Sequence, residues 1–381
     1  MKKILAINIL YTPSGGSKTQ IINMLDDFVR DDSLQVIIYT TRQNSWLFEQ
    51  YTESELVVKY SYISGLSSFF RILWEQIVLP FILMGDGVDV IFCPGNISPL
   101  LCDAKKVQWI GTIGPFCNSI YKYDFSLLAK LKLYINGKLI VKSARTSDFV
   151  IFESEYSRKM FIEDFNINVN ATRVISIGKD EYFINKVDII SKIFSDYEPY
   201  VLSVSHLYPY KHIPEMIRSF CKVNQERGMK YKLLIAGSKK SEKYYKKITD
   251  EIAFNDASEY VVLLGAVDKQ KLLELYTKCE LLFYTSPCES AGYTLVEAMS
   301  CGSSILCSNM TAAPETCNKA ALYFDPFDIV DMTDKLGYLL DRPNELSAMS
   351  KKSLRRVDDL PSYVEASHET LDIIKKLIKI K

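Results

Sequence analysis

Two glutamates with seven residues between them stand out in the stretch C-E-S-A-G-Y-T-L-V-E-A-M-S-C-G, residues 288–302. Paired carboxylates often act as general acid and general base. The pattern around this pair argues against that chemistry. Glu289 follows an apolar run and is predicted to lie in a loop, whereas Glu297 lies one turn inside a helix predicted for residues 293–301. Gly292 permits the turn before this helix, and Gly302 is a normal helix stop.

The start of this predicted helix suits an anionic ligand. The backbone amides of residues 291–294 lie at the helix N-terminus, where unpaired N–H groups and the positive end of the helix dipole favour a diphosphate. Glu297 would reach a neighbouring diol, because one carboxylate can accept two hydrogen bonds from vicinal hydroxyls. Glu289 would then contact another part of the same ligand. An isolated glutamate pair at this spacing is more often solvated surface, so the functional interpretation depends on the surrounding motifs.

The elements that must position these groups alternate along the chain. Apolar runs typical of buried parallel strands recur with helical stretches between them. The predicted strands are 4–10, 35–39, 88–93, 106–110, 149–152 and 173–177 in the first half, and 200–205, 232–236, 261–264, 281–284 and 304–308 in the second. Two such series, with a seam near 183–199, predict an α/β fold of two Rossmann-like doubly wound domains facing across a cleft. We expect the site at the carboxyl ends of the strands.

Composition disfavours several classes of function. The chain has 381 residues, which suits two domains, and its 46 Lys plus Arg balance its 46 Asp plus Glu, which argues against a nucleic-acid binder. Nine cysteines without a C-x-x-C pair and only three histidines argue against a metal site and favour a reducing cytosol. The apolar segment 69–84 contains Arg71 and Glu75, so we interpret it as a helix rather than a membrane span.

A glycine-rich turn, P-S-G-G-S-K-T at 13–19, follows the first predicted strand. It is not a P-loop, because Ser17 separates Gly16 from Lys18 and that motif requires glycine directly before lysine. Gly15 and Gly16 would still let a ligand approach the backbone at the start of a helix. A tight turn without a ligand is an equally good interpretation.

The second half of the chain resembles glycosyltransferase family 4, the retaining nucleotide-sugar enzymes with a GT-B fold, and in particular its bacterial surface-polysaccharide members. The motifs that carry the resemblance occur in the family's order, at 265–276 (G-A-V-D-K-Q-K-L-L-E-L-Y), 288–302, 308–316 (S-N-M-T-A-A-P-E-T) and 321–326 (A-L-Y-F-D-P). The resemblance is specific over 200–326 and looser in the first half. It implies an acceptor domain at 1–190, a nucleotide-sugar domain at 191–360, and an amphipathic helix at 361–381 that packs back towards the first domain.

The resemblance implies a role for each candidate residue. Glu297 would hold the ribose hydroxyls and Glu289 would face the transferred sugar. Lys211 lies where the family stabilises the leaving diphosphate with a cation, and His206 stands in place of the family's usual arginine. A strand-end cap is the other interpretation of His206. The further donor contacts that it implies are Ser290, Ala291, Gly292, Tyr293, Thr294, Gly15, Gly16 and the backbone near Val267.

One departure from the family concerns a histidine that often follows a strand in the first domain. The corresponding run here is V-Q-W-I-G-T-I-G-P-F at 107–116, and Gly111 falls at that position. The three histidines of the chain, at 206, 212 and 368, lie elsewhere, so no catalytic histidine is transferred to this chain. The D-G-V-D run at 86–89 has the wrong spacing for a metal motif. We therefore expect a metal-independent mechanism with no cofactor beyond the nucleoside-diphosphate sugar donor.

A basic stretch at 122–145 bears on the acceptor. Its lysines and arginine alternate with leucine and isoleucine, and Asp124 is the one acidic residue among them. The stretch is either a solvated helix face over the core or an amphipathic element on an anionic membrane. The second interpretation would suit a polyprenyl-linked glycan acceptor. It would place the protein in the cytoplasm at the inner face of the cytoplasmic membrane.

The sequence therefore predicts a retaining hexosyltransferase that extends a lipid-linked surface glycan such as O-antigen or capsule. A non-catalytic nucleotide-sugar-binding subunit of a polysaccharide assembly complex stays open, because two positions depart from the family. A phosphorylase or epimerase on the same fold also stays open. A dinucleotide oxidoreductase is disfavoured, because no G-x-G-x-x-G follows the first strand.

Overall fold

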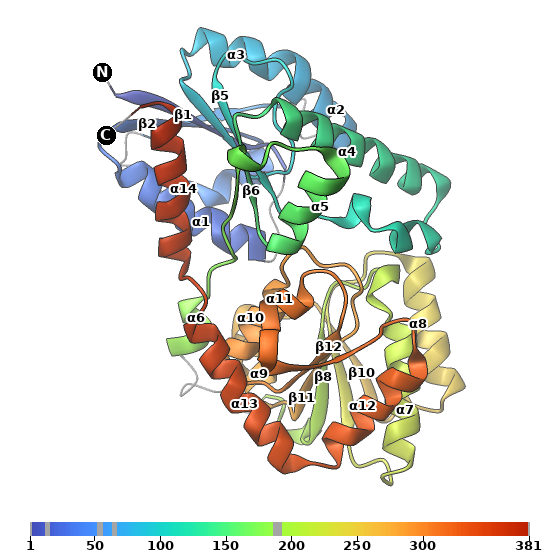
Figure 1. Cartoon of the computed structure of the whole chain (residues 1–381). Coiled ribbons are helices and arrows are strands. Elements are labelled where there is room, and N and C mark those ends of the chain that lie inside the picture. The colour runs from blue at the N-terminus through green and yellow to red at the C-terminus, as the bar shows by residue number, and fades with distance from the viewer. Residues whose placement is uncertain (1, 12–15, 52–55, 63–66, 186–192, 380–381) are drawn as a thin grey trace. The chain divides into compact units, whose positions relative to one another are not determined.

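The computed structural model describes residues 2–11, 16–51, 56–62, 67–185 and 193–379. It divides into two compact units (Figure 1), each built on a parallel sheet, which confirms the predicted fold class of two Rossmann-like domains. Unit 1 comprises Met1–Phe116, Leu128–Gly178 and Pro361–Lys381, and unit 2 comprises Cys117–Leu127 and Lys179–Leu360. The division after Gly178 lies upstream of the seam predicted near 183–199. The short segment Cys117–Leu127 belongs to unit 2, although the sequence placed it in the first domain.

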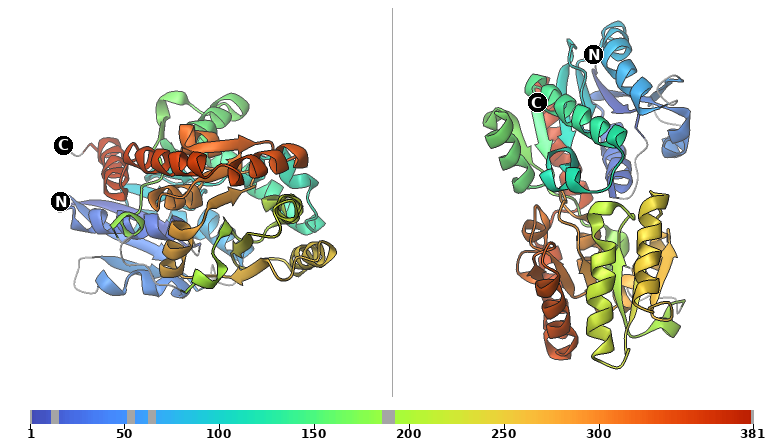
Figure 2. Two further views of the ribbon diagram at one scale, coloured as in Figure 1. Left: turned by 90° about the horizontal axis from the view of Figure 1, so that it is seen from below. Right: turned by 90° about the vertical axis from the view of Figure 1, so that its right-hand side faces the viewer.

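Unit 1 contains a seven-stranded parallel sheet in the order β3-β2-β1-β4-β5-β6-β7. Its strands are β1 (Lys3–Ile9), β2 (Leu34–Thr40), β3 (Val57–Tyr60), β4 (Val90–Cys93), β5 (Lys105–Ile110), β6 (Phe149–Phe152) and β7 (Thr172–Val174). Its helices are α1 (Gly16–Arg30), α2 (Ser68–Leu73), the π-helical turn η3 (Trp74–Val78), α3 (Leu79–Gly85), α4 (Leu127–Thr146), α5 (Glu155–Phe165) and α14 (Tyr363–Leu377). The first strand and the last helix thus lie in the same unit (Figure 2).

Helices cover both faces of the sheet in unit 1. Alternate strand residues such as Ile7 and Phe92 pack with α1 and α14 in one core, which includes Ile374 of the last helix. Residues of the opposite parity pack against α3 in a second core and against α4 and α5 in a third. Because side chains alternate across a strand, α3, α4 and α5 share one face and α1 and α14 the other. The last helix is thus an integral part of the unit 1 core.

Unit 2 contains a six-stranded parallel sheet in the order β10-β9-β8-β11-β12-β13. Its strands are β8 (Tyr200–Val204), β9 (Lys232–Ala236), β10 (Val261–Gly265), β11 (Leu281–Tyr284), β12 (Ile305–Ser308) and β13 (Ala321–Phe324). Its helices are α6 (Glu181–Asn185), α7 (Ile213–Gln225), α8 (Glu242–Phe254), α9 (Lys269–Lys278), α10 (Tyr293–Ser300), α11 (Ala313–Cys317), α12 (Ile329–Leu340) and α13 (Pro343–Asp358). In both sheets the chain starts at a central strand, builds outward, and then returns to build the other side.

Most predicted strands are present within about two residues of their expected ends, because long buried apolar runs are the clearest pattern that a sequence offers. The strands β3 and β13 were not predicted. Both have four residues and lie at the edges of their sheets, where half-exposed side chains dilute the apolar pattern. The stretch 122–145 is not one element, since its first residues lie in unit 2 and the rest form α4.

Candidate functional site

The candidate residues of unit 2 gather where the direction of its sheet topology reverses. Strands β8, β9 and β10 extend one way from the centre of the sheet, and β11, β12 and β13 extend the other way. The reversal lies between β8 and β11, and crevices at the carboxyl ends of such neighbouring strands are the usual ligand sites of open α/β sheets. Lys211 follows β8 and Glu289 follows β11. The topology therefore brings two residues 78 positions apart to the same edge of the sheet.

Lys211 and Glu289 form an ion pair at this edge. The Lys211 Nζ contacts Glu289 Oε1, and the two side chains are only 10% and 14% exposed. Lys211 is the last residue of the short turn η8 (Pro209–Lys211), and its carbonyl accepts a 2.6 Å hydrogen bond from Thr285 Oγ1. A nearly buried pair of this kind is costly to break by removal of one partner alone, because the other charge is left desolvated. The structure thus holds a positioned ammonium group at the predicted diphosphate site.

Two tyrosines complete the surroundings of this ion pair. The Lys211 Nζ lies 3.4 Å from the Tyr284 hydroxyl, and it lies 5.2 Å from the ring centroid of Tyr210. Burial, together with the neighbouring Glu289 carboxylate, holds the pKa of both phenols well above the ordinary value. Both hydroxyls therefore stay protonated and can act as hydrogen-bond donors beside the ion pair. The sequence reasoning did not name either tyrosine.

The loop that carries Glu289 is fixed by contacts with the segment after β12. The Glu289 N–H donates to Thr311 Oγ1 at 2.9 Å, and the Glu289 carbonyl accepts from the Ala312 N–H at 3.3 Å. Three residues later, Gly292 caps α10 in the left-handed conformation with φ of 86°. The N–H groups of Leu295 and Val296 donate to its carbonyl. The predicted helix start, with residues 290–294 before and within its first turn, is therefore present and begins as expected.

Glu297 lies in α10, and its carboxylate has a tyrosine hydroxyl as a partner. The Tyr276 hydroxyl donates a 3.0 Å hydrogen bond to Glu297 Oε2. Burial raises the pKa of the Glu297 carboxyl to about 7, and the Tyr276 hydrogen bond only partly offsets this effect. The carboxyl is therefore about half ionised at neutral pH. Its pKa is sensitive to Asp180, which raises it, and to Lys269, which lowers it.

The start of α9 lies beside Glu297. Lys269 forms an ion pair with Asp180, and its ammonium group lies over the ring of Tyr182. Asp268 caps α9 by accepting from the Lys271 N–H at 2.9 Å. The half-buried Val267 immediately precedes this cap, in the turn that follows β10. Its backbone is thus at the same carboxyl edge as Glu297. The contact of this backbone with a nucleotide base stays a prediction.

His206 lies in the loop after β8 and is held by a neighbouring loop. Its Nδ1 is 2.7 Å from Ser238 Oγ. Burial lowers the pKa of the His206 imidazole, and the charges of Lys240 and Lys211 lower it further. The lowered pKa favours the neutral imidazole near pH 7, which can offer a phosphate a hydrogen bond. The phosphate contact of His206 stays a prediction. The loops approach closely at Gly237, with φ of 157°, where an added Cβ would lie 1.7 Å from a backbone oxygen of Ser205.

A disulfide links the site loop to the segment Cys117–Leu127. Cys288, which precedes Glu289, is bonded to Cys117, with 6.5 Å between their Cα atoms. Cysteine spacing could not predict this pair, because 171 residues separate the two cysteines. The bond runs against the reducing cytosol that the scattered cysteines favoured, because disulfides are rare there. Further along the same segment, the Tyr123 hydroxyl contacts His212 Nε2, and Asp124 pairs with Lys247 at 3.0 Å. These contacts explain why this segment belongs to unit 2.

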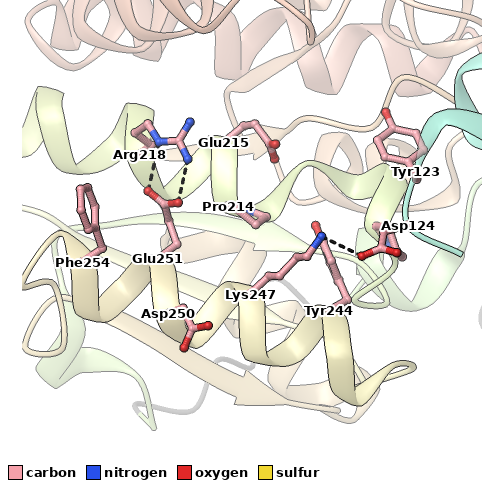
Figure 3. Close-up of a pocket in the computed structure, with 11 residues that line it drawn as sticks. Tyr123, Asp124, Pro214, Glu215, Arg218, Tyr244, Lys247, Asp250, Glu251 and Phe254 are labelled. Atoms are coloured by element: carbon pink, nitrogen blue, oxygen red, sulfur yellow. Dashed lines mark hydrogen bonds and ion pairs between the residues drawn. The ribbon is translucent and has the colours of Figure 1, made fainter.

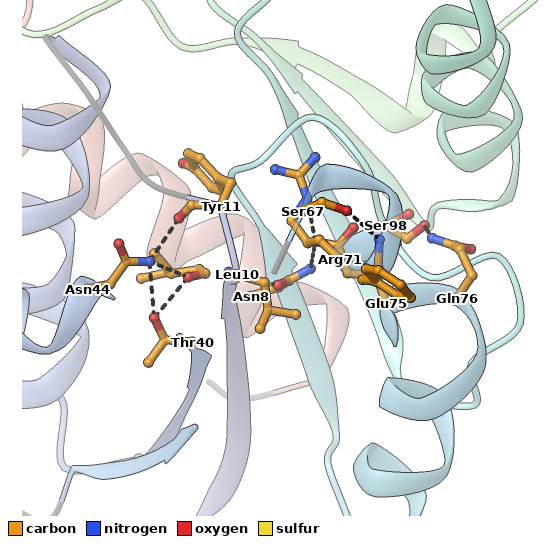
Figure 4. A network of polar contacts seen from close by, with 12 residues as sticks. Asn8, Leu10, Tyr11, Thr40, Asn44, Ser67, Arg71, Glu75, Gln76 and Ser98 are labelled. Carbon is orange, nitrogen blue, oxygen red and sulfur yellow. Dashed lines mark hydrogen bonds and ion pairs between the residues drawn. The ribbon is translucent and has the colours of Figure 1, made fainter. Parts of the chain in front are cut away.

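The corresponding edge of unit 1 carries a buried polar network (Figure 4). The sheet topology reverses direction between the paired strands β1 and β4, and Asn8 of β1 donates to Glu75 Oε1 at 3.3 Å. Burial raises the pKa of the Glu75 carboxyl to about 7, and the partner Arg71 only partly opposes this. Gly16 begins α1 beside this edge, while Gly15 lies outside the described residues. The donor role of both glycines stays a prediction.

Glu153 occupies the space beside Gly111, at the carboxyl ends of β5 and β6. A Cβ on Gly111 would lie 2.8 Å from Glu153 Oε1. The Trp109 indole N–H donates to the same oxygen at 3.3 Å. A side chain at position 111 would therefore require this carboxylate to move.

A groove of about 480 Å³ opens elsewhere on unit 2, between α7, α8 and the Tyr123 region (Figure 3). Its charges pair with one another, since Arg218 makes a two-pronged contact with Glu251 at 3.1 and 2.8 Å. The residues that line it include none of the candidate site residues. Within the part of the chain that the structure describes, no three His, Cys, Asp or Glu side chains gather in a way that could hold a metal ion. Metal independence stays a prediction.

Comparison with known proteins fits this geometry. A family model described as glycosyl transferases group 1 matches residues 186–356. This part of the chain is therefore similar to group 1 glycosyltransferases. It contains Lys211, Glu289 and Glu297 together with the other candidate residues of unit 2. The resemblance to a glycosyltransferase that the motifs predicted is thereby confirmed.

The relatives with curated names are bacterial. The chain is 24% identical over 202 residues to the O-antigen chain mannosyltransferase B of Escherichia coli, a match that covers 50% of this chain and 51% of that protein. It is 28% identical over 227 residues to the O-antigen chain mannosyltransferase RfbU of Salmonella typhimurium strain LT2, which covers 60% of each. The chain thus spans about half the length of the first of these relatives. The crystal structure of HepE from Anabaena in complex with UDP-glucose superposes on the whole chain with a TM-score of 0.74 at 16% identity, a likeness of fold.

Proposed function

We propose that this protein is a retaining glycosyltransferase that moves a hexose from a nucleoside-diphosphate sugar to a surface glycan. The observation that carries the proposal is the Lys211–Glu289 ion pair at the β8–β11 reversal, beside the start of α10 and within the matched domain. The names of the relatives favour mannose as the sugar and O-antigen as the product. The lipid-linked acceptor, the cytoplasmic location and the absence of a metal requirement belong to the same proposal.

Each candidate group has a role that its geometry permits. Lys211 would transfer its contact from Glu289 to the leaving diphosphate, since an ammonium group stabilises the charge that develops as the glycosidic bond breaks. Glu289, released from Lys211, would accept hydrogen bonds from the sugar. Tyr284 would donate to a phosphate or sugar oxygen. The amides at the start of α10 would bind the diphosphate, and His206 would add a neutral hydrogen bond.

Glu297 would act on the other side of the donor. The Tyr276 hydroxyl holds Glu297 Oε2 in place. The lone pairs of Oε1 and the remaining lone pair of Oε2 would accept hydrogen bonds from both ribose hydroxyls. The ionised form is required, because a protonated carboxyl accepts less well and donates instead. The nucleotide base of the donor would contact the backbone near Val267.

The proposal is tested with a panel of nucleotide sugars that includes GDP-mannose, GDP-glucose, UDP-glucose and dTDP-glucose. A true donor raises the melting temperature, and the increase grows with the logarithm of its concentration. The same donor must then lose its sugar to a synthetic polyprenyl-linked glycan, with retention at the anomeric carbon. Binding without turnover on any acceptor would support the non-catalytic subunit instead. Conversion of the donor without an acceptor would indicate an epimerase.

A further inference from the structure

The helical segment Ser68–Gly85 of unit 1 presents a long apolar face to solvent. It runs without a break through α2, η3 and α3, which confirms the predicted helix. By length and composition alone it could cross a membrane, with a mean hydropathy of 1.3 and only 17% of its residues buried. The outward side chains, each between 39% and 69% exposed, are Phe69, Phe70, Leu73, Ile77, Val78, Phe81 and Met84.

The inner face of this segment is part of the unit 1 core. Leu79 and Leu83 are 0% and 1% exposed and pack against the sheet. The Leu79 N–H donates to the Trp74 carbonyl, a π-type hydrogen bond that lets the helix continue into Pro80. Crossing a bilayer would require these leucines to leave the core. The segment is therefore built to lie on a surface rather than to span one.

The outer face of the segment carries no charge. Its two ionisable residues, Arg71 and Glu75, pair at 3.8 Å with side chains only 19% and 6% exposed. The Glu75 carboxylate also accepts from Asn8 in the buried network of Figure 4. Contiguous exposed apolar surface of this extent on a folded protein marks an interaction site.

Helix α4 supplies positive charge on the same side of the sheet. The segment joins its surroundings through Gln76, which donates to the Ser98 carbonyl at 3.2 Å, and Ser98 in turn contacts Ser147 just after α4. Helix α4 contains no Asp or Glu. It exposes apolar side chains beside its lysines, at Leu128 (63%), Leu131 (53%) and Ile135 (52%). Its lysines are Lys130, Lys132, Lys138 and Lys142.

We propose that this face of unit 1, formed by Ser68–Gly85 and α4, binds the surface of an anionic phospholipid bilayer. The outward apolar side chains of Ser68–Gly85 would enter the boundary between headgroups and acyl chains, and the lysines of α4 would contact lipid phosphates. A neutral apolar partner would leave those lysines without complementary charge. The inference goes beyond the matched domain, since it concerns unit 1 alone and holds whichever sugar unit 2 binds.

The test measures co-sedimentation of the full chain with vesicles of phosphatidylglycerol and phosphatidylcholine. We expect binding that falls as phosphatidylglycerol is omitted and as salt rises from 0.1 to 0.5 M, because salt screens surface charge over about 10 Å or less. Phe69→Ser with Phe81→Ser should weaken binding at least about tenfold, since each removes a large apolar side chain from the lipid. Lys132→Gln with Lys138→Gln should weaken it about tenfold and reduce its salt dependence.

The matched control is Phe254→Ser in α8 of unit 2, where the phenyl ring is 86% exposed. It should bind vesicles as the unaltered chain does. A Phe81→Trp variant should show fluorescence quenching by brominated acyl chains, and a Phe254→Trp variant should show none. Melting temperatures within about 3 °C of the unaltered chain show that the variants fold. Vesicle binding that is absent, or equally lost in the control, overturns the proposal. A dimer that Phe69→Ser and Phe81→Ser dissolve, with no vesicle binding, would assign the face to a second copy.

Discussion

The raised pKa of Glu297 gives the donor site a specific pH dependence. A carboxyl with a pKa of about 7 is about one-tenth ionised at pH 6 and about nine-tenths ionised at pH 8. If only the carboxylate accepts from the ribose diol, the apparent dissociation constant of the donor should fall about tenfold between these two pH values. Glu297→Gln should abolish this dependence. It should also weaken binding at pH 8 by about one to two decades, since hydrogen bonds to a charged group contribute about 1.5–3 kcal/mol.

The assay is isothermal titration of an intact nucleotide sugar, whose diphosphate has no group that titrates in this range. His206 acts with the opposite sign, because protonation at low pH would favour an anionic ligand. A His206→Gln variant separates the two effects and should retain the tenfold rise in affinity with pH. Donor affinity that is equal at pH 6 and pH 8 in both backgrounds would refute the role of Glu297. So would a Glu297→Gln variant that binds as tightly as the unaltered chain.

Three further outcomes follow from the structure. Gly237→Ala should lower the melting temperature by more than about 10 °C, because its Cβ would overlap a backbone oxygen at 1.7 Å. Gly228→Ala, with open space around it, should lower the melting temperature by less than about 6 °C. Equal effects of the two substitutions would contradict the steric argument. Burial penalises the ionised form of Glu75, so the stability of the protein should fall as pH rises from 4.5 to about 7. Glu75→Gln should therefore stabilise the protein at pH 8 but not at pH 5. Denaturant unfolding at both pH values measures the difference in unfolding free energy between the variant and the unaltered chain. Alkylation of the unfolded, unreduced protein should modify seven cysteines, and alkylation after reduction should modify nine. Nine modified cysteines without reduction would contradict the Cys117–Cys288 bond.

The sequence predicted the parts of this molecule in which chemistry and pattern coincide. The loop with Glu289, the start of α10 and the position of Glu297 all follow from one continuous stretch, so local rules were sufficient. Lys211 was predicted from the family resemblance, as the cation beside the leaving diphosphate. Its ion pair with Glu289, 78 residues further along the chain, depends on the neighbouring positions of β8 and β11, which are fixed only by the sheet topology.

The features that sequence reasoning missed are tertiary. Tyr276 and Tyr284 read as ordinary apolar residues of a helix and a strand, and only the fold turns their hydroxyls towards Glu297 and Lys211. The neutral state of His206 depends on burial and on two neighbouring lysines. The charges of the segment 69–84 argued for a helix rather than a membrane span, but the sequence did not show that these charges pair inward and leave the outer face apolar.

The central claim is that Lys211 and Glu289 both contact the donor, Lys211 at the diphosphate and Glu289 at the sugar, rather than only stabilising the fold through their ion pair. It is tested by kcat and donor Kd for Glu289→Gln, measured with the donor that the nucleotide-sugar panel identifies. Because Glu289 competes with the diphosphate for Lys211, the account predicts that turnover falls at least about a hundredfold while the donor binds as tightly or more tightly. A variant with intact turnover and weakened donor binding would contradict the account.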